Sequence, residues 1–167
     1  MTRQISPAGL HLIASFEGFV PSPYDDSRGF ATIGYGHLIS PQPVDQAIRE
    51  AWGTITVDRG LELLRGDAQI AVDAVNRTVE VRLALLPSIA QARFDALCSL
   101  AYNIGGGALE GSTLLRLINE RGAPRDWTTL GPYWLEWDHA GAAVIPGLLS
   151  RRRLEFGLYV TGRYPIV

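Results

Sequence analysis

Two carboxylates and a hydroxyl, Glu17, Asp26 and Thr32, follow one another at short intervals near the start of the chain. A pair of carboxyl groups can hydrolyse a glycosidic bond when one carries a proton and the other is ionised, because the first protonates the leaving oxygen and the second serves a water. A hydroxyl beside the ionised member can bind the same water. The residue types therefore predict a hydrolytic site.

Glu17 lies at the end of a predicted helix, residues 7–17, in which Pro7 suits the first turn and Gly18 the stop. Apolar residues repeat along it at helical spacing: Leu10, Ile13 and Ala14. Glu17 continues this stripe, so we expect its side chain to face the core. Burial and the negative end of the helix dipole would then favour the protonated form that a general acid requires. The alternative is a surface glutamate at a fraying helix end.

A β-hairpin is predicted directly after this helix. Residues 19–24 read as an extended segment, DDSRG supplies a turn, and residues 30–35 alternate as a return strand. Asp26 lies in the polar turn, where we expect it to stay ionised. Thr32 lies on the return strand, where its hydroxyl can share a water with Asp26.

The stretch EGFVPSPYDDSRGFATIGYGH, residues 17–37, resembles the catalytic signature of the phage-type lysozymes, the endolysins of glycoside hydrolase family 24. Residues 91–119 and 137–160 resemble two further blocks of that family, in the family's order. The family spacing selects Asp26 over Asp25. The resemblance implies that Glu17 is the general acid and that Asp26 and Thr32 position the water.

The resemblance also implies the fold, an α+β lysozyme-like domain over residues 1–167. A small N-terminal lobe with the hairpin would cover about residues 15–66, and a long helix, about 67–79, would connect it to a larger helical lobe. That second lobe would cover about residues 80–167 together with the first helix, and a cleft between the lobes would hold an extended glycan.

Further site residues are implied by the family alignment. Four would bind substrate: Leu38, Tyr102, Ser112 and Thr113. Five would support the site: Gly36, His37, Asp67, Arg151 and Arg152. A contact between His37 and Asp67 would hold the hairpin to the connecting helix, and Arg151 or Arg152 would reach Glu17. The alternatives are a His37 that only packs at the strand end and three solvated arginines, Arg151 to Arg153.

Between these landmarks the local patterns are weaker. Residues 38–43 read as a polar exit from the hairpin, and residues 44–53 are ambiguous with some helical character. A short helix over 57–64 should be interrupted at Gly66. An apolar helix running to Ile104 should form the centre of the larger lobe, and the aromatic cluster in residues 124–137 should be mostly core.

The composition is that of a globular protein: 167 residues, 47% hydrophobic, 19% charged, with a net charge of −2. No segment is apolar over a length that spans a bilayer, and no basic stripe suggests nucleic acid, so we expect neither stable membrane insertion nor nucleic-acid binding. The single cysteine, Cys98, lies among apolar residues and should be a buried thiol. No metal or other cofactor is expected.

The activity implied by the resemblance is hydrolysis of the β-1,4 bond between N-acetylmuramic acid and N-acetylglucosamine in bacterial peptidoglycan, for lysis of the host cell. The start of the chain does not read as a signal sequence. We therefore expect a monomer that stays in the host cytoplasm until a separate holin-type protein opens the membrane, and then acts on glycan strands in the periplasm and wall. Two alternatives are a lytic transglycosylase cleaving the same bond and a non-catalytic wall-binding module.

Overall fold

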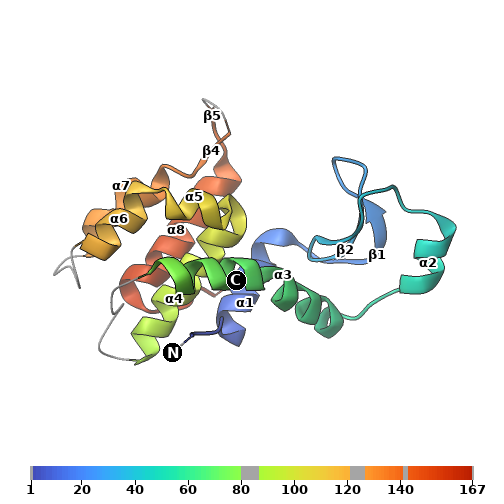
Figure 1. Cartoon of the computed structure of the whole chain (residues 1–167), viewed down its shortest axis with the longest axis horizontal. Helices are drawn as coiled ribbons and strands as arrows, with labels where there is room; N and C mark the ends of the chain where they lie inside the picture. The colour runs from blue at the N-terminus through green and yellow to red at the C-terminus, as the bar shows by residue number, and fades with distance from the viewer. Residues whose placement is uncertain (1, 80–86, 121–126, 141–142, 167) are drawn as a thin grey trace. The chain divides into compact units, whose positions relative to one another are not determined.

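The computed structural model describes residues 2–79, 87–120, 127–140 and 143–166 (Figure 1). Within these ranges the chain combines helices with a three-stranded and a two-stranded antiparallel sheet, which confirms the predicted α+β class. The chain divides into two compact units, residues 10–69 and residues 1–9 with 70–167. The division between residues 69 and 70 falls inside helix α3 (Val57–Thr78). No helix in the described ranges has the length and apolar character of a membrane span.

The first helix, α1, has the predicted bounds, Pro7–Glu17. Ser6 caps its start, because the Ser6 hydroxyl accepts a hydrogen bond of 3.0 Å from the backbone N–H of Gly9. Gly18 ends the helix with a φ of 70°, in the left-handed region that favours glycine. The apolar stripe is buried as its spacing indicated: Leu10, Ile13 and Ala14.

The three-stranded sheet of the smaller unit is formed by β1 (Val20–Asp25), β2 (Ala31–Gly34) and β3 (His37–Ser40), in that order. The hairpin of β1 and β2 is confirmed, and all of the central strand β2 is buried. The prediction that residues 38–43 form only a polar exit is wrong, because β3 pairs antiparallel with β2. Gly34 and Gly36 turn the chain back between them, with φ of 66° and 90°.

Residues 44–53 contain a short helix, α2 (Gln46–Trp52). The Asp45 side chain caps it by accepting a hydrogen bond of 2.8 Å from the backbone N–H of Ile48. The weak helical character of this segment is therefore confirmed.

Helix α3 runs without interruption over 22 residues, so the predicted break at Gly66 is wrong. A glycine inside a helix costs about 1 kcal/mol relative to alanine. Gly66 is exposed, and no atom lies close to the position of its missing Cβ. The glycine therefore adds only this cost of about 1 kcal/mol to the helix. Burial of the apolar residues on either side outweighs it. These are Leu64, Ala68, Ala71, Val72 and Val75.

Helix α3 packs closely against the smaller unit's other elements through Gly60. A Cβ atom at Gly60 would lie 2.7 Å from the ring of Phe19 and 3.3 Å from the ring of Tyr35. The two rings contact each other, with centroids 5.1 Å apart. Only glycine allows the helix backbone to approach these rings so closely.

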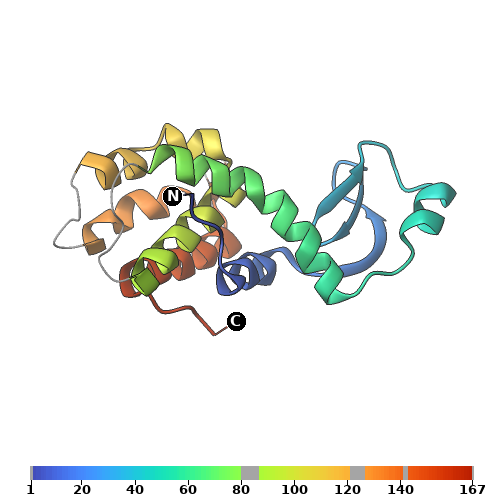
Figure 2. The same ribbon diagram turned by 60° about the horizontal axis from the view of Figure 1, so that its bottom comes forward.

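The larger unit is built around α4 (Pro87–Ile104), as predicted, and α8 (Pro146–Thr161) lies beside it (Figures 1 and 2). Cys98 is fully buried on α4, and burial raises the pKa of its thiol well above the usual value. Shorter elements complete the unit: α5 (Gly106–Glu110), α6 (Thr113–Glu120), the 3₁₀ helix η1 (Trp127–Leu130), α7 (Gly131–Leu135), β4 (His139–Ala140) and β5 (Ala143–Val144).

The aromatic cluster is core at Trp134, which is fully buried against the rings of Phe156 and Tyr159. Tyr133 and Trp137 are only partly buried. The first residues of the cluster's segment, 124–126, and the side chain of Trp127 lie outside the described part, as do residues 83–86 before α4.

A buried carboxylate ties both ends of the chain to α4. Asp95 accepts hydrogen bonds from the Ser6 backbone N–H, at 3.1 Å, and from the Ser6 hydroxyl, at 2.5 Å. The Tyr164 hydroxyl donates to the same side chain at 2.5 Å. Gly9 passes so close that a Cβ there would lie 2.5 Å from the carboxyl carbon of Asp95. These hydrogen bonds of Asp95 therefore hold the start of α1 and the segment after α8 against α4.

Candidate active site

Asp26 is held at the hairpin turn by backbone donors. Its Oδ1 accepts hydrogen bonds from the N–H of Arg28, at 2.8 Å, and of Phe30, at 2.9 Å. The Arg28 Nε lies 3.6 Å from Oδ2. The bond from Phe30, followed by those from Arg28 and its charge, lowers the pKa of Asp26 below the usual value. This direction favours the ionised form of Asp26 that the polar turn predicted.

The neighbouring carboxylate, Asp25, has a different task. Its Oδ1 accepts a hydrogen bond of 2.7 Å from the backbone N–H of Val44, which holds the chain after β3 to the end of β1. Asp25 is therefore engaged by the chain after β3, whereas Asp26 is engaged by the N–H donors of the turn. The choice of Asp26 over Asp25 as the catalytic residue stays a prediction.

Thr32 lies on the central strand, directly opposite Tyr24 of β1 and Leu38 of β3. Its side chain is 4% exposed, and its hydroxyl donates a hydrogen bond of 3.0 Å to the carbonyl of Phe30. A hydroxyl whose proton is engaged in this way has only lone pairs to offer. Thr32 can therefore accept a hydrogen bond from a water and orient it.

Glu17 is the last residue of α1, as predicted, but it is exposed rather than core-facing. The stripe that buries Leu10, Ile13 and Ala14 ends one turn before it, and Gly18 then redirects the chain. Helical spacing predicted the side of the helix on which Glu17 lies, but not that this end of the helix is exposed to solvent. The surface alternative describes its exposure correctly, while the dipole of the helix C-terminus still acts on it.

Tyr24 has its hydroxyl within the electrostatic influence of both carboxylates, Asp26 and Glu17. Burial, then the charge of Asp26, then the charge of Glu17 raise the pKa of its hydroxyl. All three residues belong to the smaller unit. Tyr24 was not among the predicted site residues. Its position two residues before Asp26, the spacing at which side chains of an extended segment return to one side, is the signal that could have revealed it.

His37 makes the predicted contact with Asp67. Its Nδ1 lies 3.0 Å from both carboxylate oxygens, and its ring lies 5.7 Å from that of Trp52, measured between centroids. Gly36 precedes it with a φ of 90°, so glycine is needed at that turn. The contact holds β3 to α3 within the smaller unit, and whether it supports catalysis stays a prediction.

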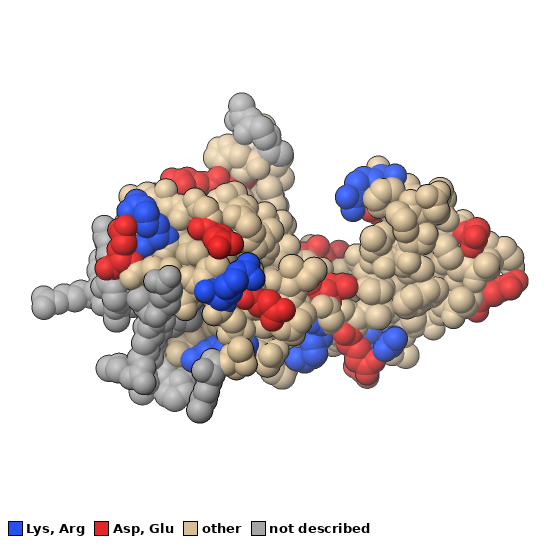
Figure 3. Space-filling model, in the orientation of Figure 1, with Lys and Arg blue, Asp and Glu red and all other residues tan. Residues whose placement is uncertain are grey.

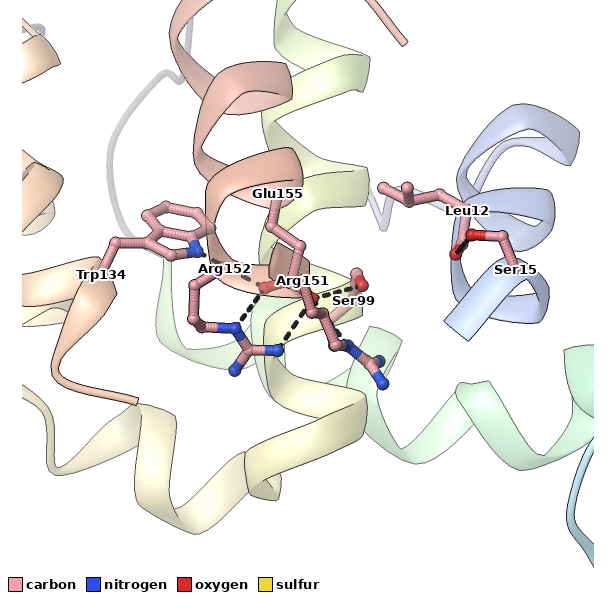
Figure 4. A network of polar contacts seen from close by, with 7 residues as sticks. All are labelled: Leu12, Ser15, Ser99, Trp134, Arg151, Arg152 and Glu155. Carbon is pink, nitrogen blue, oxygen red and sulfur yellow. Dashed lines mark hydrogen bonds and ion pairs between the residues drawn. The ribbon is translucent and has the colours of Figure 1, made fainter. Parts of the chain in front are cut away.

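Arg151 and Arg152 are buried on α8, so the alternative of three solvated arginines is wrong for these two. Both bind Glu155 of the same helix, Arg151 with Nε 3.1 Å from Oε1 and Arg152 with Nε 2.8 Å from Oε2 (Figure 4). The Ser99 hydroxyl donates to Glu155 at 2.6 Å. Burial raises the pKa of Glu155, and the two guanidinium groups oppose that effect. A contact of either arginine with Glu17 stays a prediction.

The four predicted substrate-binding residues differ in their surroundings. Leu38 is 50% exposed beside Thr32, Tyr102 is partly buried on α4, and Thr113 is exposed. Ser112 is buried at the start of α6, where its hydroxyl donates to the Leu109 carbonyl and accepts from the Leu115 N–H. Its observed task is therefore that of a helix cap, and a role in substrate binding stays a prediction.

Charges are mixed over the described surface. On the face drawn in Figure 3, arginine positions lie next to aspartate and glutamate positions. Exposed ion pairs among the described residues include Arg59 with Glu62, Arg77 with Glu110, and Arg116 with Glu120. In the described ranges no three histidine, cysteine or carboxylate side chains are grouped as metal ligands.

Known proteins are similar to this chain in sequence and in fold. A family model described as phage lysozyme matches residues 14–155. The chain is 38% identical over 160 residues to an endolysin of Bacillus phage B103, an alignment that covers 95% of this chain and 54% of that protein. The chain thus spans about half the length of that curated relative.

Two solved structures are similar over almost all of the chain. An endolysin from Escherichia coli O157:H7 phage FAHEc1 superposes with a TM-score of 0.80 at 31% identity, covering 99% of both chains. The muramidase domain of SpmX from Asticaccaulis excentricus superposes with a TM-score of 0.76 at 33% identity, covering 95% of this chain and 99% of that one. Together with the site geometry, the family match shows that this chain belongs to the phage lysozyme family and has its lysozyme-like fold.

Proposed function

We propose that the chain hydrolyses the β-1,4 bond between N-acetylmuramic acid and N-acetylglucosamine in bacterial peptidoglycan. The observation that carries the proposal is an Asp26 held at the turn that ends β1, with the ionised form favoured, together with a Thr32 hydroxyl on the paired strand β2 whose proton is already engaged. Membership of the phage lysozyme family and the similarity to a muramidase domain support the choice of substrate.

In the proposed reaction Glu17 donates its proton to the glycosidic oxygen as the bond from that oxygen to the anomeric carbon breaks. A water held by Asp26 and Thr32 attacks the anomeric carbon from the opposite side and gives a proton to Asp26. A later exchange of protons with solvent restores Glu17 and Asp26. Direct attack by water inverts the anomeric configuration, whereas a covalent sugar intermediate on Asp26 would retain it. No cofactor takes part.

Product analysis tests this reaction. Purified chain is added to outer-membrane-permeabilised bacteria, clearing is followed by turbidity, and the released fragments are analysed by mass spectrometry. Hydrolysis predicts fragments with reducing ends. A lytic transglycosylase would leave anhydro ends, and a wall-binding module would bind without clearing the suspension. Proton NMR of the first product then shows whether its configuration is inverted.

We further propose that the protein acts on glycan strands as a monomer, and that it waits in the host cytoplasm until a separate holin-type protein opens the membrane. The names of its relatives, endolysins of phages, support this placement. Expression of the chain in Escherichia coli should leave cells intact until a holin is co-expressed, and prompt lysis without it would contradict the proposed dependence. Light scattering of the purified chain tests the oligomeric state.

A further inference from the structure

One face of the three-stranded sheet carries a row of three side chains. Tyr24, Thr32 and Leu38 lie directly opposite one another on β1, β2 and β3. Opposed side chains in an antiparallel pair have Cβ atoms about 5 Å apart. Asp26 directly follows β1 and continues its pairing, because the Asp26 backbone N–H donates to the Phe30 carbonyl at 3.0 Å. The two-residue repeat of an extended chain then puts Asp26 on the side of Tyr24. Tyr24 therefore borders the two groups proposed to hold the water.

The Tyr24 side chain is only partly buried, so its hydroxyl can reach a ligand on this face. In the part of the chain that the structure describes, the hydroxyl makes no hydrogen bond to protein. Burial and the charges of Asp26 and Glu17 all raise its pKa. A phenol in this setting keeps its proton throughout the neutral range and is a hydrogen-bond donor.

A sugar bound for single displacement has its anomeric carbon between the proton donor and the attacking water. The Tyr24 hydroxyl feels the charges of both carboxylates, so it lies near that same region. We propose that Tyr24 is a further residue of the active site and that its hydroxyl donates a hydrogen bond to an oxygen of the sugar that is attacked. This inference rests on the proposed hydrolysis and adds a substrate contact to it.

The test replaces only the hydroxyl, with Tyr24→Phe, and uses Tyr35→Phe as its matched control. Tyr35 lies on the turn after β2, and its ring packs on Phe19. Loss of one uncharged hydrogen bond predicts a fall in kcat/KM of about fivefold to tenfold for Tyr24→Phe on soluble glycan fragments released from peptidoglycan. Tyr35→Phe should keep the wild-type value.

Two further measurements separate a substrate contact from other roles. Since the Tyr24 hydroxyl is partly desolvated without a protein partner, Tyr24→Phe should melt at the wild-type temperature or slightly above it. A structural role would lower the melting temperature instead. A role in tuning Asp26 or Glu17 would displace a limb of the pH–rate profile, whereas a substrate contact lowers the whole profile without moving its limbs.

A binding measurement tests the same contact without depending on turnover. In a Glu17→Gln background, Tyr24→Phe should weaken calorimetric binding of the same glycan fragments by about fivefold. For Tyr24→Phe, an unchanged affinity, an unchanged kcat/KM or a displaced limb of the pH–rate profile would each overturn the inference. The proposed hydrolysis would still stand in these cases if the wild-type protein cleaves the fragments. Wild-type protein that binds the fragments without cleaving them would overturn the proposed hydrolysis itself, and the affinity of Tyr24→Phe would then still decide the contact.

Discussion

Asp26 and Glu155 are both paired with arginine, but their surroundings are opposite. Asp26 lies at a turn with its side chain 23% exposed, and its arginine partner, Arg28, is 71% exposed. Glu155 and Arg152 are both 0% exposed, in the core of the larger unit. The same kind of pair is therefore found in a solvated setting at Asp26 and in a fully buried one at Glu155.

The hydrogen bonds differ in the same sense. At Asp26, Oδ1 accepts from two backbone N–H groups, while among the described residues Oδ2 has only the Arg28 Nε, 3.6 Å away. At Glu155 both oxygens are engaged, by Ser99 and the two arginines and by the Trp134 N–H at 3.5 Å (Figure 4). A carboxylate can position water only where an oxygen is left for it. The comparison shows that exposure and spare acceptors, more than charge, distinguish the carboxylate proposed to position water from the one buried in the core.

The largest expected effect is the loss of the proton donor. Glu17→Gln keeps the size of the side chain but cannot protonate a leaving oxygen, so the rate of wall lysis should fall at least about a thousandfold. Because Glu17 is exposed at a helix end, the thermal melt should hardly change. Turbidity clearing and circular dichroism measure the two properties.

Glu62→Gln is the matched control for that variant, since Glu62 is an exposed glutamate paired with Arg59. It should retain wild-type lysis. Lysis by Glu17→Gln at a rate close to that of the control would remove Glu17 from the role of acid.

The second effect concerns stability. Glu155→Gln leaves two buried guanidinium groups without their counter-charge, which should cost about 3 kcal/mol of the free energy of unfolding. For a chain of 167 residues this corresponds to a melting temperature lower by roughly 6–12 °C. Scanning calorimetry gives the value.

Glu120→Gln removes the matched exposed pair with Arg116 and should change the stability by less than about 1 kcal/mol. Equal losses in the two variants would show that burial does not distinguish the pairs and would break the comparison.

These two regions also show what the sequence could and could not predict. The turn DDSRG predicted an ionised Asp26 because turns are solvated and rich in backbone donors. Glu155 could not be identified in this way, since a charged residue is normally taken for surface, and only the packing of α4 against α8 buries it. A local sequence pattern predicts the secondary structure around a residue, but it does not show which distant elements pack over that residue and bury it.

The same limit explains the errors in the fold. Helices α1 and α4 and the hairpin follow from caps, spacing and turn residues and were predicted. Strand β3 and the unbroken α3 depend on pairing and packing with distant residues, such as the contact of Gly60 with Phe19. Glu17 was correctly predicted to end the helix but wrongly predicted to be buried. Helical periodicity gives the face on which a side chain lies and not its exposure to solvent.

The third prediction tests the partner of Asp26 in holding water. Thr32→Ala removes the oxygen that can accept from the water, so kcat should fall by about tenfold to a hundredfold. Thr32→Ser keeps that oxygen and should keep most of the activity. Steady-state rates on soluble glycan fragments decide, and equal activity of the alanine and serine variants would show that the hydroxyl does not hold the water.

The smallest effect sharpens the comparison at Asp26 itself. Its folded pKa lies below the usual value, so the ionised form is favoured by the fold, and this contribution is lost only as the pH falls through the lowered pKa. Arg28→Gln removes the charge and the side-chain hydrogen bond but leaves the N–H donors of residues 28 and 30, which include the largest cause. The acidic limb of the pH–rate profile should therefore move slightly towards higher pH.

Arg59→Gln is the control, because Arg59 is also exposed and pairs with Glu62 on α3. Its profile should coincide with that of the wild type. If Arg28→Gln coincided with it as well, the backbone donors alone would set the ionisation of Asp26, and the exposed arginine would contribute nothing there, in contrast to the arginines that enclose Glu155. A large upward shift would show instead that the exposed pair is coupled about as tightly as the buried one, because solvent would then not be weakening it.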